Sequence, residues 1–329
     1  MTRVMASGVL LAAAFCWGAG NVASKTVLDH LEPLTVVSLR CLLAALVIAP
    51  FALRDLRHFR CGTEPGWAKG VLGISALFAV ALVLQQLAYK FTSVTNVSFL
   101  VNTATVMTPV IAWLALGHRA GLAVACATPL TLLGALLMSG AAYSVASINL
   151  GDLLCLASAA VYAGWMVALG HHAVTYRRPL GTTFVQFALS AVLVLPLALW
   201  IDAPDLRAIG QAGPELFMLG VFSTALAFGL QTWAQRFVSA STAAVLVSAE
   251  SLFGALGAYL LLGEQTGFLG LIGAALILTA IVFVAMGDRT TPTAGTLASR
   301  QGLEPPVAAS HAPIPSPACQ TVSRSIKAG

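Results

Sequence analysis

The sequence consists largely of apolar segments about 20 residues long, separated by short polar, charged or proline-containing breaks. An α-helix needs about 20 such residues to cross the hydrocarbon core of a bilayer. Only 9% of the 329 residues are charged, whereas soluble domains carry roughly 25%, so the chain cannot cover a water-exposed surface. We therefore predict an all-α integral membrane protein with ten transmembrane helices. These spans are placed at residues 5–25, 33–53, 68–89, 96–116, 121–140, 151–170, 181–201, 215–235, 241–262 and 267–286.

The lysine and arginine residues lie mainly at the ends of these segments. With ten spans and a cytoplasmic N-terminus, thirteen of the 17 basic residues fall on the cytoplasmic side. Only Lys25, Lys90 and Arg207 fall on the other side, and Arg40 lies within a span. The positive-inside rule therefore predicts a multi-pass protein of the inner (cytoplasmic) membrane with both termini in the cytoplasm. Because the basic residues do not form one patch, the net charge of +5 does not indicate a nucleic-acid partner.

The sequence also matches itself at a constant offset of 146 residues. Residues 84–121 and 230–267 are identical at 12 of 38 aligned positions. In a separate stretch, Pro33-Leu34 recurs at the same offset as Pro179-Leu180. A shared offset in two stretches indicates an internal duplication.

The duplication predicts how the chain is organised. We expect a first repeat at residues 1–144, a second repeat at 145–287, and a disordered cytoplasmic tail at 288–329, which is rich in Pro, Ser, Thr and Ala. Each repeat holds five predicted spans, and because five is odd, the second repeat must begin on the opposite side of the membrane. Two inverted five-helix repeats are typical of secondary transporters, which bind substrate near the bilayer midplane between the halves.

Several short motifs occur in a characteristic order. They are Trp17-Gly18-Ala19-Gly20-Asn21, Ser38-Leu39-Arg40, Leu116-Gly117-His118 and Leu262-Gly263-Glu264. With these motifs, residues 5–286 resemble the EamA family of the drug/metabolite transporter superfamily. The resemblance implies ten helices around a central cavity and the export or uptake of small metabolites such as amino acids. The chain departs from the family pattern at His118, where Glu is usual, and at Glu250-Ser251, where Glu-Pro is common, so the substrate stays open.

Two charged residues lie well inside predicted spans, away from the span ends. Such groups are costly in lipid and are therefore candidates for a functional role, although polar side chains also join helices structurally. Arg40 lies seven residues into its span and could contact substrate, form a gate or anchor the helix at the interface. Glu250 is the acidic residue deepest in a span, and it could carry a proton or make a structural hydrogen bond.

Uncharged polar residues supply the other candidates. Thr95, Ser98, Asn102 and Thr105 form a stripe at helical spacing in the fourth span, and Ser241, Ser248 and Ser251 repeat part of it in the ninth. Gln85 and Gln231 match across the repeat and could form symmetric gates near opposite faces. The full set of candidate cavity residues is Trp17, Asn21, Arg40, Gln85, Ser98, Asn102, Tyr162, Trp165, Gln186, Gln231 and Ser248, with Glu250 as the proton-coupling candidate.

These features predict a secondary transporter that moves a small polar metabolite, such as an amino acid, by alternating access. Export is expected from the resemblance alone. No nucleotide-binding or metal-ligand motif occurs in the sequence, so we expect no cofactor, no ATP-driven pumping and no enzymatic activity. A multidrug or cation efflux transporter is the alternative in the same class, and a membrane-embedded enzyme or a channel is the alternative in another. The expected partners are a small-molecule substrate, the lipid bilayer and, through Glu250, protons.

Overall fold

The computed structural model describes residues 3–57, 66–92, 94–117, 119–138, 149–176, 178–262 and 267–287. Every regular element in these ranges is helical, which confirms the predicted all-α membrane fold. The longer helices are α1 (Arg3–Thr26), α2 (Pro33–Arg57), α3 (Trp67–Phe91), α6 (Leu122–Met138), α7 (Leu150–Tyr176), α8 (Pro179–Leu197) and α14 (Phe268–Gly287). Residues 288–329, where a disordered tail is predicted, lie outside the described residues, as do His118 and Glu264.

The remaining predicted spans are assembled from shorter helical pieces. They are α4 (Val94–Val101), α5 (Ala104–Leu116), α10 (Gly213–Phe217), the π-helix η4 (Met218–Leu226), α11 (Ala227–Ala234), α12 (Ala240–Val247) and α13 (Glu250–Leu262). The turn η1 (Val27–Asp29), the π-helix η3 (Ala198–Asp202) and α9 (Leu206–Gln211) lie between the spans or at their ends.

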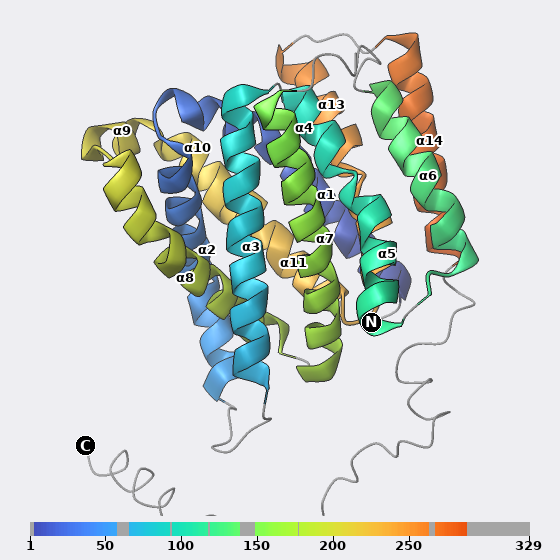
Figure 1. Cartoon of the computed structure of the whole chain (residues 1–329), viewed down its shortest axis with the longest axis horizontal. Helices are drawn as coiled ribbons and strands as arrows, with labels where there is room; N and C mark the ends of the chain where they lie inside the picture. The colour runs from blue at the N-terminus through green and yellow to red at the C-terminus, as the bar shows by residue number, and fades with distance from the viewer. Residues whose placement is uncertain are drawn as a thin grey trace, which may run out of the picture.

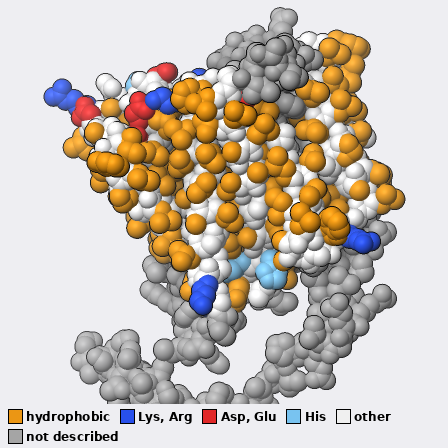
Figure 2. All heavy atoms as spheres, in the orientation of Figure 1, with side chains coloured by type: hydrophobic (Ala, Val, Ile, Leu, Met, Phe, Trp, Pro, Cys, Tyr) orange, Lys and Arg blue, Asp and Glu red, His pale blue; other side chains and the backbone are white. Residues whose placement is uncertain are grey.

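Within the described residues, eight helices, some of them joined end to end, are long and apolar enough to cross a membrane. The predicted fourth and fifth spans contain shorter apolar helices, at Ala104–Leu116 and Leu122–Leu137. Helix length therefore does not confirm the count of ten, although each predicted segment contains helix. In the view of Figure 2, hydrophobic side chains cover the lateral surface and charged ones lie at its two ends, as a lipid environment requires.

The predicted fourth and ninth spans are both interrupted. Asn102-Thr103 separates α4 from α5, and Ser248-Ala249 separates α12 from α13. The two breaks are 146 residues apart, and all four helices around them begin and end at matching positions. The duplication seen in the sequence is therefore also present in the backbone.

Helix packing follows the same relation. The pairs α2 with α8 and α6 with α14, which occupy corresponding places in the two halves, pack along their lengths (Figure 1). The contact of α3 with α7 has its counterpart in the contact of α1 with α11 and η4. Lys25 at the end of α1 and Asp152 at the start of α7 both bond to Thr92, just after α3. The two corresponding helices α1 and α7 therefore run in opposite directions.

An aromatic cluster occupies the middle of the bundle. The ring of Phe78 on α3 lies 4.7 Å from that of Phe228 on α11 and 5.4 Å from that of Trp165 on α7, measured between centroids. Trp17 on α1 contacts the other side of the cluster, with its ring centroid 4.7 Å from that of Phe228. Aromatic rings in this arrangement add attraction to the burial of their area, and they bring four helices to one point.

Gly18 allows α1 to approach α13 closely. A Cβ atom at Gly18 would lie 2.7 Å from the backbone nitrogen of Gly254 and 2.8 Å from the carbonyl oxygen of Glu250. Both atoms belong to the backbone, which cannot move aside as a flexible side chain does. Small residues at such contacts allow helices in lipid to pack closely, because no hydrophobic effect drives them together there.

We predict that Gly18→Ala lowers the thermal unfolding temperature of the detergent-solubilised protein, since overpacking costs about 1–3 kcal/mol. Gly8→Ala on the same helix is the matched control, because a Cβ atom there meets nothing within 4 Å. It should leave the unfolding temperature unchanged or raise it through better helix propensity. Equal unfolding temperatures for the two variants would show that α1 and α13 do not rely on this contact.

Candidate functional site

A partly open cavity lies among α1, α2, α3, α4, α5, α7, η4, α11, α12 and α13, with about 710 Å³ of space between its atoms, part of it continuous with the surroundings. Its wall combines aromatic rings, amides, hydroxyls and two side chains of opposite charge. The lining residues are Trp17, Asn21, Ser24, Arg40, Leu82, Gln85, Val101, Asn102, Ala104, Thr105, Tyr162, Trp165, Met166, Ser223, Phe228, Gln231, Ala244, Val247 and Glu250.

The helix breaks border this cavity. Val101, Asn102 and Ala104 line it from the first break, and Val247 and Glu250 line it from the second. Asn102 Nδ2 donates to the carbonyl oxygen of Ser98 at 2.8 Å and also to Ser251 Oγ, which joins the two broken spans. Discontinuous helices at corresponding places in two halves are the usual site of substrate and ion binding in secondary transporters, because they expose backbone groups and helix ends there.

Arg40 is positioned by hydroxyl groups from the opposite half of the chain. Its Nε atom donates to Thr224 Oγ1 at 2.9 Å, and its Nη2 atom lies 3.4 Å from Ser223 Oγ. Both hydroxyls lie on the π-helix η4, a rare helix type often found at functional sites. The Arg40 side chain is only 5% exposed, yet no carboxylate forms an ion pair with it in the described part of the chain.

Glu250 is the first residue of α13 and lies directly after the break. Its Oε1 atom accepts a hydrogen bond from Asn21 Nδ2 at 2.9 Å. The N-terminal end of a helix favours a negative charge, so α13 stabilises the carboxylate at this place. Among the described residues, no cation forms an ion pair with it. The corresponding residue at the start of α5 is Ala104, which also lines the cavity, so only one of the two half-helix ends carries an acid.

Aromatic and amide groups form the rest of the wall. Tyr162 donates its hydroxyl proton to Gln85 Oε1 at 3.1 Å, and its ring centroid lies 6.0 Å from that of Trp165. The indole nitrogen of Trp17 donates to the carbonyl oxygen of Ser223 at 2.9 Å. Gln85 and Gln231, expected near opposite faces of the membrane, both line this one cavity.

Most of the predicted cavity residues line this space, but three do not. Ser98 accepts a hydrogen bond from Asn21 at 3.4 Å, Ser248 bonds to the carbonyl oxygen of Val245 in its own helix, and Gln186 accepts from the indole nitrogen of Trp165 at 2.9 Å. Ser98 and Gln186 therefore bond to side chains that line the cavity, whereas the Ser248 hydroxyl bonds within its own helix. The stripe predicted along the fourth span is divided by the break at Asn102, so its members do not share one helical face.

Sequence reasoning missed Ser223, Thr224 and Phe228. At the offset of 146 residues, Ser223-Thr224 aligns with Leu77-Phe78, so two hydroxyls replace two apolar side chains in one repeat only. This difference between the repeats could have identified Ser223 and Thr224 as candidates, because it places two polar side chains in an otherwise apolar segment. Phe228 aligns with Leu82, which also lines the cavity, and nothing distinguishes it from a packing residue in the sequence.

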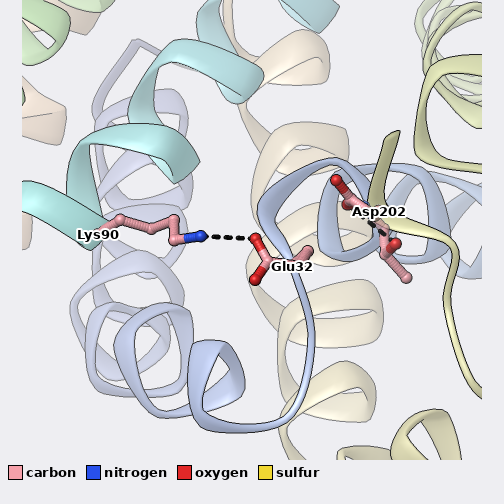
Figure 3. Close-up of polar contacts among 4 residues, drawn as sticks. Glu32, Lys90 and Asp202 are labelled. Carbon is pink, nitrogen blue, oxygen red and sulfur yellow. Dashed lines mark hydrogen bonds and ion pairs between the residues drawn. The ribbon is translucent and has the colours of Figure 1, made fainter. Parts of the chain in front are cut away.

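Polar contacts tie several helices together at one end of the bundle, where α1 and α3 end and α2 begins. Lys90 Nζ lies 2.6 Å from Glu32 Oε2, and Asp202 Oδ2 accepts hydrogen bonds from the backbone nitrogen and the hydroxyl of Thr35, at 2.7 and 3.0 Å (Figure 3). Lys25 donates to the carbonyl oxygens of Tyr89 and Thr92.

A further contact at this end joins α3 to α7. Thr92 Oγ1 donates to Asp152 Oδ1 at 2.8 Å, and Asp152 Oδ2 accepts from the backbone nitrogen of Asn149 at 3.1 Å. The ends of α1, α3 and η3 are thus held to the starts of α2 and α7.

Comparison with known proteins identifies the family of the chain. The sequence pattern of the EamA-like transporter family matches residues 5–140 and again residues 149–286. The chain belongs to the EamA-like transporter family. An uncharacterized transporter of Archaeoglobus fulgidus is 27% identical over 285 residues, which cover 86% of this chain and 87% of that protein. The uncharacterized transporter YwfM of Bacillus subtilis is 26% identical over 293 residues, which cover 87% and 95%.

The fold of this EamA-like transporter is also found among solved structures. One crystal structure matches with a TM-score of 0.69 at 16% sequence identity, and the match covers 88% of this chain and 100% of the other. At that identity the likeness concerns the fold alone. Together with the apolar helices, the family match establishes a multi-pass membrane protein of a transporter family.

Proposed function

We propose that this EamA-like transporter moves a small zwitterionic metabolite, an amino acid or a related compound, across the cytoplasmic membrane. The observation that carries the proposal is that Arg40 and Glu250 line one cavity and neither has an ion-pair partner among the described residues. A charge in a membrane interior is expensive unless it is paired. A ligand with a carboxylate and an ammonium group would pair with both at once.

Other parts of the cavity agree with such a ligand. A small metabolite is surrounded by amides and hydroxyls from both repeats, and by the rings of Trp17, Tyr162 and Trp165. A lipophilic cation would suit the rings and Glu250, but it would leave the Arg40 guanidinium without a partner and beside a second positive charge. The zwitterion is therefore favoured over the cation of a multidrug efflux transporter.

We predict that wild-type protein in proteoliposomes shows counterflow of labelled amino acids, and that Arg40→Gln and Glu250→Gln each reduce it at least about tenfold. A charged hydrogen bond is worth about 1.5–3 kcal/mol, which corresponds to about ten- to hundredfold in affinity. Arg40→Gln introduces the residue that the second repeat has at this place, Gln186.

The control is Arg207→Gln, which removes an exposed charge from α9, away from the cavity, and should transport as wild type does. Competition by a lipophilic quaternary ammonium compound, with no competition by amino acids, would reject the zwitterion and support cation efflux. Unsaturable flux at rates far above those of a carrier would indicate a channel.

Glu250 also gives the proposed transporter a way to couple to protons. One carboxylate cannot hold a proton and pair with a substrate ammonium group at the same time. Proton binding and substrate binding would therefore exclude each other, and a cycle with this property exchanges protons for substrate. Exchange with protons that enter the cell would drive export, the direction proposed here, with both termini on the cytoplasmic side.

We predict that a pH gradient, acidic on the side corresponding to the cell exterior, accelerates substrate movement toward that side in wild-type proteoliposomes. Glu250→Gln cannot bind or release a proton, so any remaining counterflow should no longer respond to the gradient. Dissipating the gradient with a protonophore provides the control on the same vesicles. Wild-type transport that ignores the gradient would reject Glu250 as the proton site.

Alternating access is the mechanism we propose, with the two repeats exchanging conformations about the fixed cavity. In the proposed orientation, the end that carries the Lys90–Glu32 and Thr35–Asp202 contacts faces outward. At the offset of 146 residues, Lys90 and Glu32 correspond to Arg236 and Arg178, two cations that cannot pair with each other. Likewise, Thr35 and Asp202 correspond to Gly181 and Leu56.

The contact between Thr92 and Asp152 is also confined to one end, because the corresponding residues are Val238 and Ala6. When inverted repeats exchange conformations, contacts that close one end are replaced by the corresponding contacts at the other. Here the corresponding residues cannot form the same polar contacts with one another. The state that is closed on the outside is therefore favoured over the state that is closed on the inside.

We predict that the double variant Glu32→Gln and Asp202→Ala opens the outer end more often. Loss of two contacts worth about 1 kcal/mol each shifts the equilibrium by about ten- to thirtyfold. The measurement is the rate at which a membrane-impermeant thiol reagent, added outside intact cells, labels Ser24→Cys in the cavity wall. Asp205→Asn, which changes an exposed acid at the same end, is the control, and equal labelling rates would contradict the bias.

A further inference from the structure

Gln231 on α11 combines complete burial with a lack of internal hydrogen bonds. Its side chain is 0% exposed and lines the cavity, yet neither Nε2 nor Oε1 has a hydrogen-bond partner in the described part of the chain. A buried polar group without a partner is costly, so such groups in native proteins call for an explanation.

Two more glutamines near Gln231 are incompletely bonded in the same way. Gln186 accepts from Trp165, but its Nε2 atom has no partner among the described residues. Gln235, one helical turn after Gln231, lies 3.4 Å from the carbonyl oxygen of Met166 through Nε2, whereas its Oε1 atom lacks a partner there. Trp165 and Met166 both line the cavity, so Gln186 and Gln235 each bond to a residue that lines it together with Gln231.

The other repeat shows that these amides are a specific feature. At the offset of 146 residues, Gln186, Gln231 and Gln235 correspond to Arg40, Gln85 and Tyr89. Each of these counterparts is bonded: Arg40 donates to Thr224, Gln85 accepts from Tyr162, and the Tyr89 hydroxyl donates to Asn21 Oδ1 at 3.3 Å. These three residues of the first repeat therefore have partners within the protein, two of them in the second repeat, whereas the three glutamines leave both donors and acceptors without partners among the described residues.

We propose that Gln231, supported by Gln186 and Gln235, recognises an uncharged substrate group that both donates and accepts hydrogen bonds, such as a carboxamide. The inference rests on the proposed zwitterionic substrate, whose charged groups pair with Arg40 and Glu250. An amide is neutral and offers one acceptor beside two donors, so it matches another carboxamide in a pair of hydrogen bonds. An aliphatic side chain would leave the Gln231 amide without partners, and a site of this kind rejects ligands that lack the polar group.

The test compares L-glutamine with L-methionine, which has nearly the same size but no amide, as competitors of amino-acid counterflow into proteoliposomes with the full-length protein. In wild type, glutamine should compete at least about tenfold better than methionine. Gln231→Met should reduce this ratio to about threefold or less, mainly by improving methionine. Gln211→Met, which replaces an exposed glutamine at the end of α9, should keep the wild-type ratio.

The outcomes separate this inference from the proposed function. Counterflow without a glutamine preference in wild type, or with a preference that survives in Gln231→Met, overturns the amide subsite and leaves the transporter standing. Absence of counterflow with every amino acid overturns both.

A stability measurement tests the same inference without transport. Gln231→Met should raise the thermal unfolding temperature or leave it unchanged, because it removes polar atoms that have no partner. Gln86→Met is the matched control, since Gln86 is 1% exposed and donates to the carbonyl oxygen of Ser24 at 2.8 Å. That variant should lower the unfolding temperature. An equal drop in Gln231→Met would mean that protein or ordered water already satisfies Gln231, which overturns the subsite.

Discussion

In a bilayer, every backbone polar group needs a partner from the protein, and this constraint governs the whole structure. It explains why every regular element in the described part of the chain is helical. It also restricts where a helix can be interrupted, because the freed backbone groups must be bonded by side chains or lie against a polar cavity. The breaks at Asn102 and Ser248 meet this condition. Asn102 bonds back to Ser98 and across to Ser251, and the backbone nitrogen of Ala249 donates to a carbonyl oxygen three residues earlier at 3.3 Å.

The duplication supplies a symmetric frame for an asymmetric site. The boundaries of α4, α5, α12 and α13 agree across the repeats to the residue, so the backbone preserves the relation between the halves closely. The side chains that line the cavity differ between the two repeats. Glu250 stands where the first repeat has Ala104, and Arg40 stands where the second has Gln186. Each repeat thus contributes one charge, and the two charges have opposite sign. A substrate with a positive and a negative end would therefore bind in one preferred orientation.

The fold was largely predictable from the sequence because its determinants are local. Length and apolarity identified the spans, and the offset of 146 residues identified the duplication without any structure. The helix breaks were not predicted, since the polar residues around Asn102 and Ser248 fit a continuous helix with a polar face as well as an interrupted one. Arg40 and Glu250 could be named as candidates, but their convergence on one cavity could not be derived.

A second limit on prediction from the sequence concerns which polar residues line the cavity and which do not. Three residues are as polar as those that line the cavity but form hydrogen bonds to other protein groups instead. They are Ser98, Gln186 and Ser248. Conversely, Phe228 looks like a packing residue and lines the cavity. Pattern alone could not separate these cases, because a displacement of one residue around a helix turns a side chain by about 100°. The direction in which each side chain points therefore depended on tertiary packing.

The charges in the cavity also bear on how the proposed transporter would turn over. An empty cavity holds a guanidinium and a carboxylate without ion-pair partners among the described residues, and moving it through an occluded state would strip both of water. A bound zwitterion neutralises both charges, so the loaded protein would pass through that state at lower cost. A proton on Glu250 neutralises only one charge and leaves Arg40 to its hydroxyl partners Ser223 and Thr224. Exchange of one substrate for another should therefore be faster than net transport, and the return of the proton-loaded protein would be the slow step that limits export.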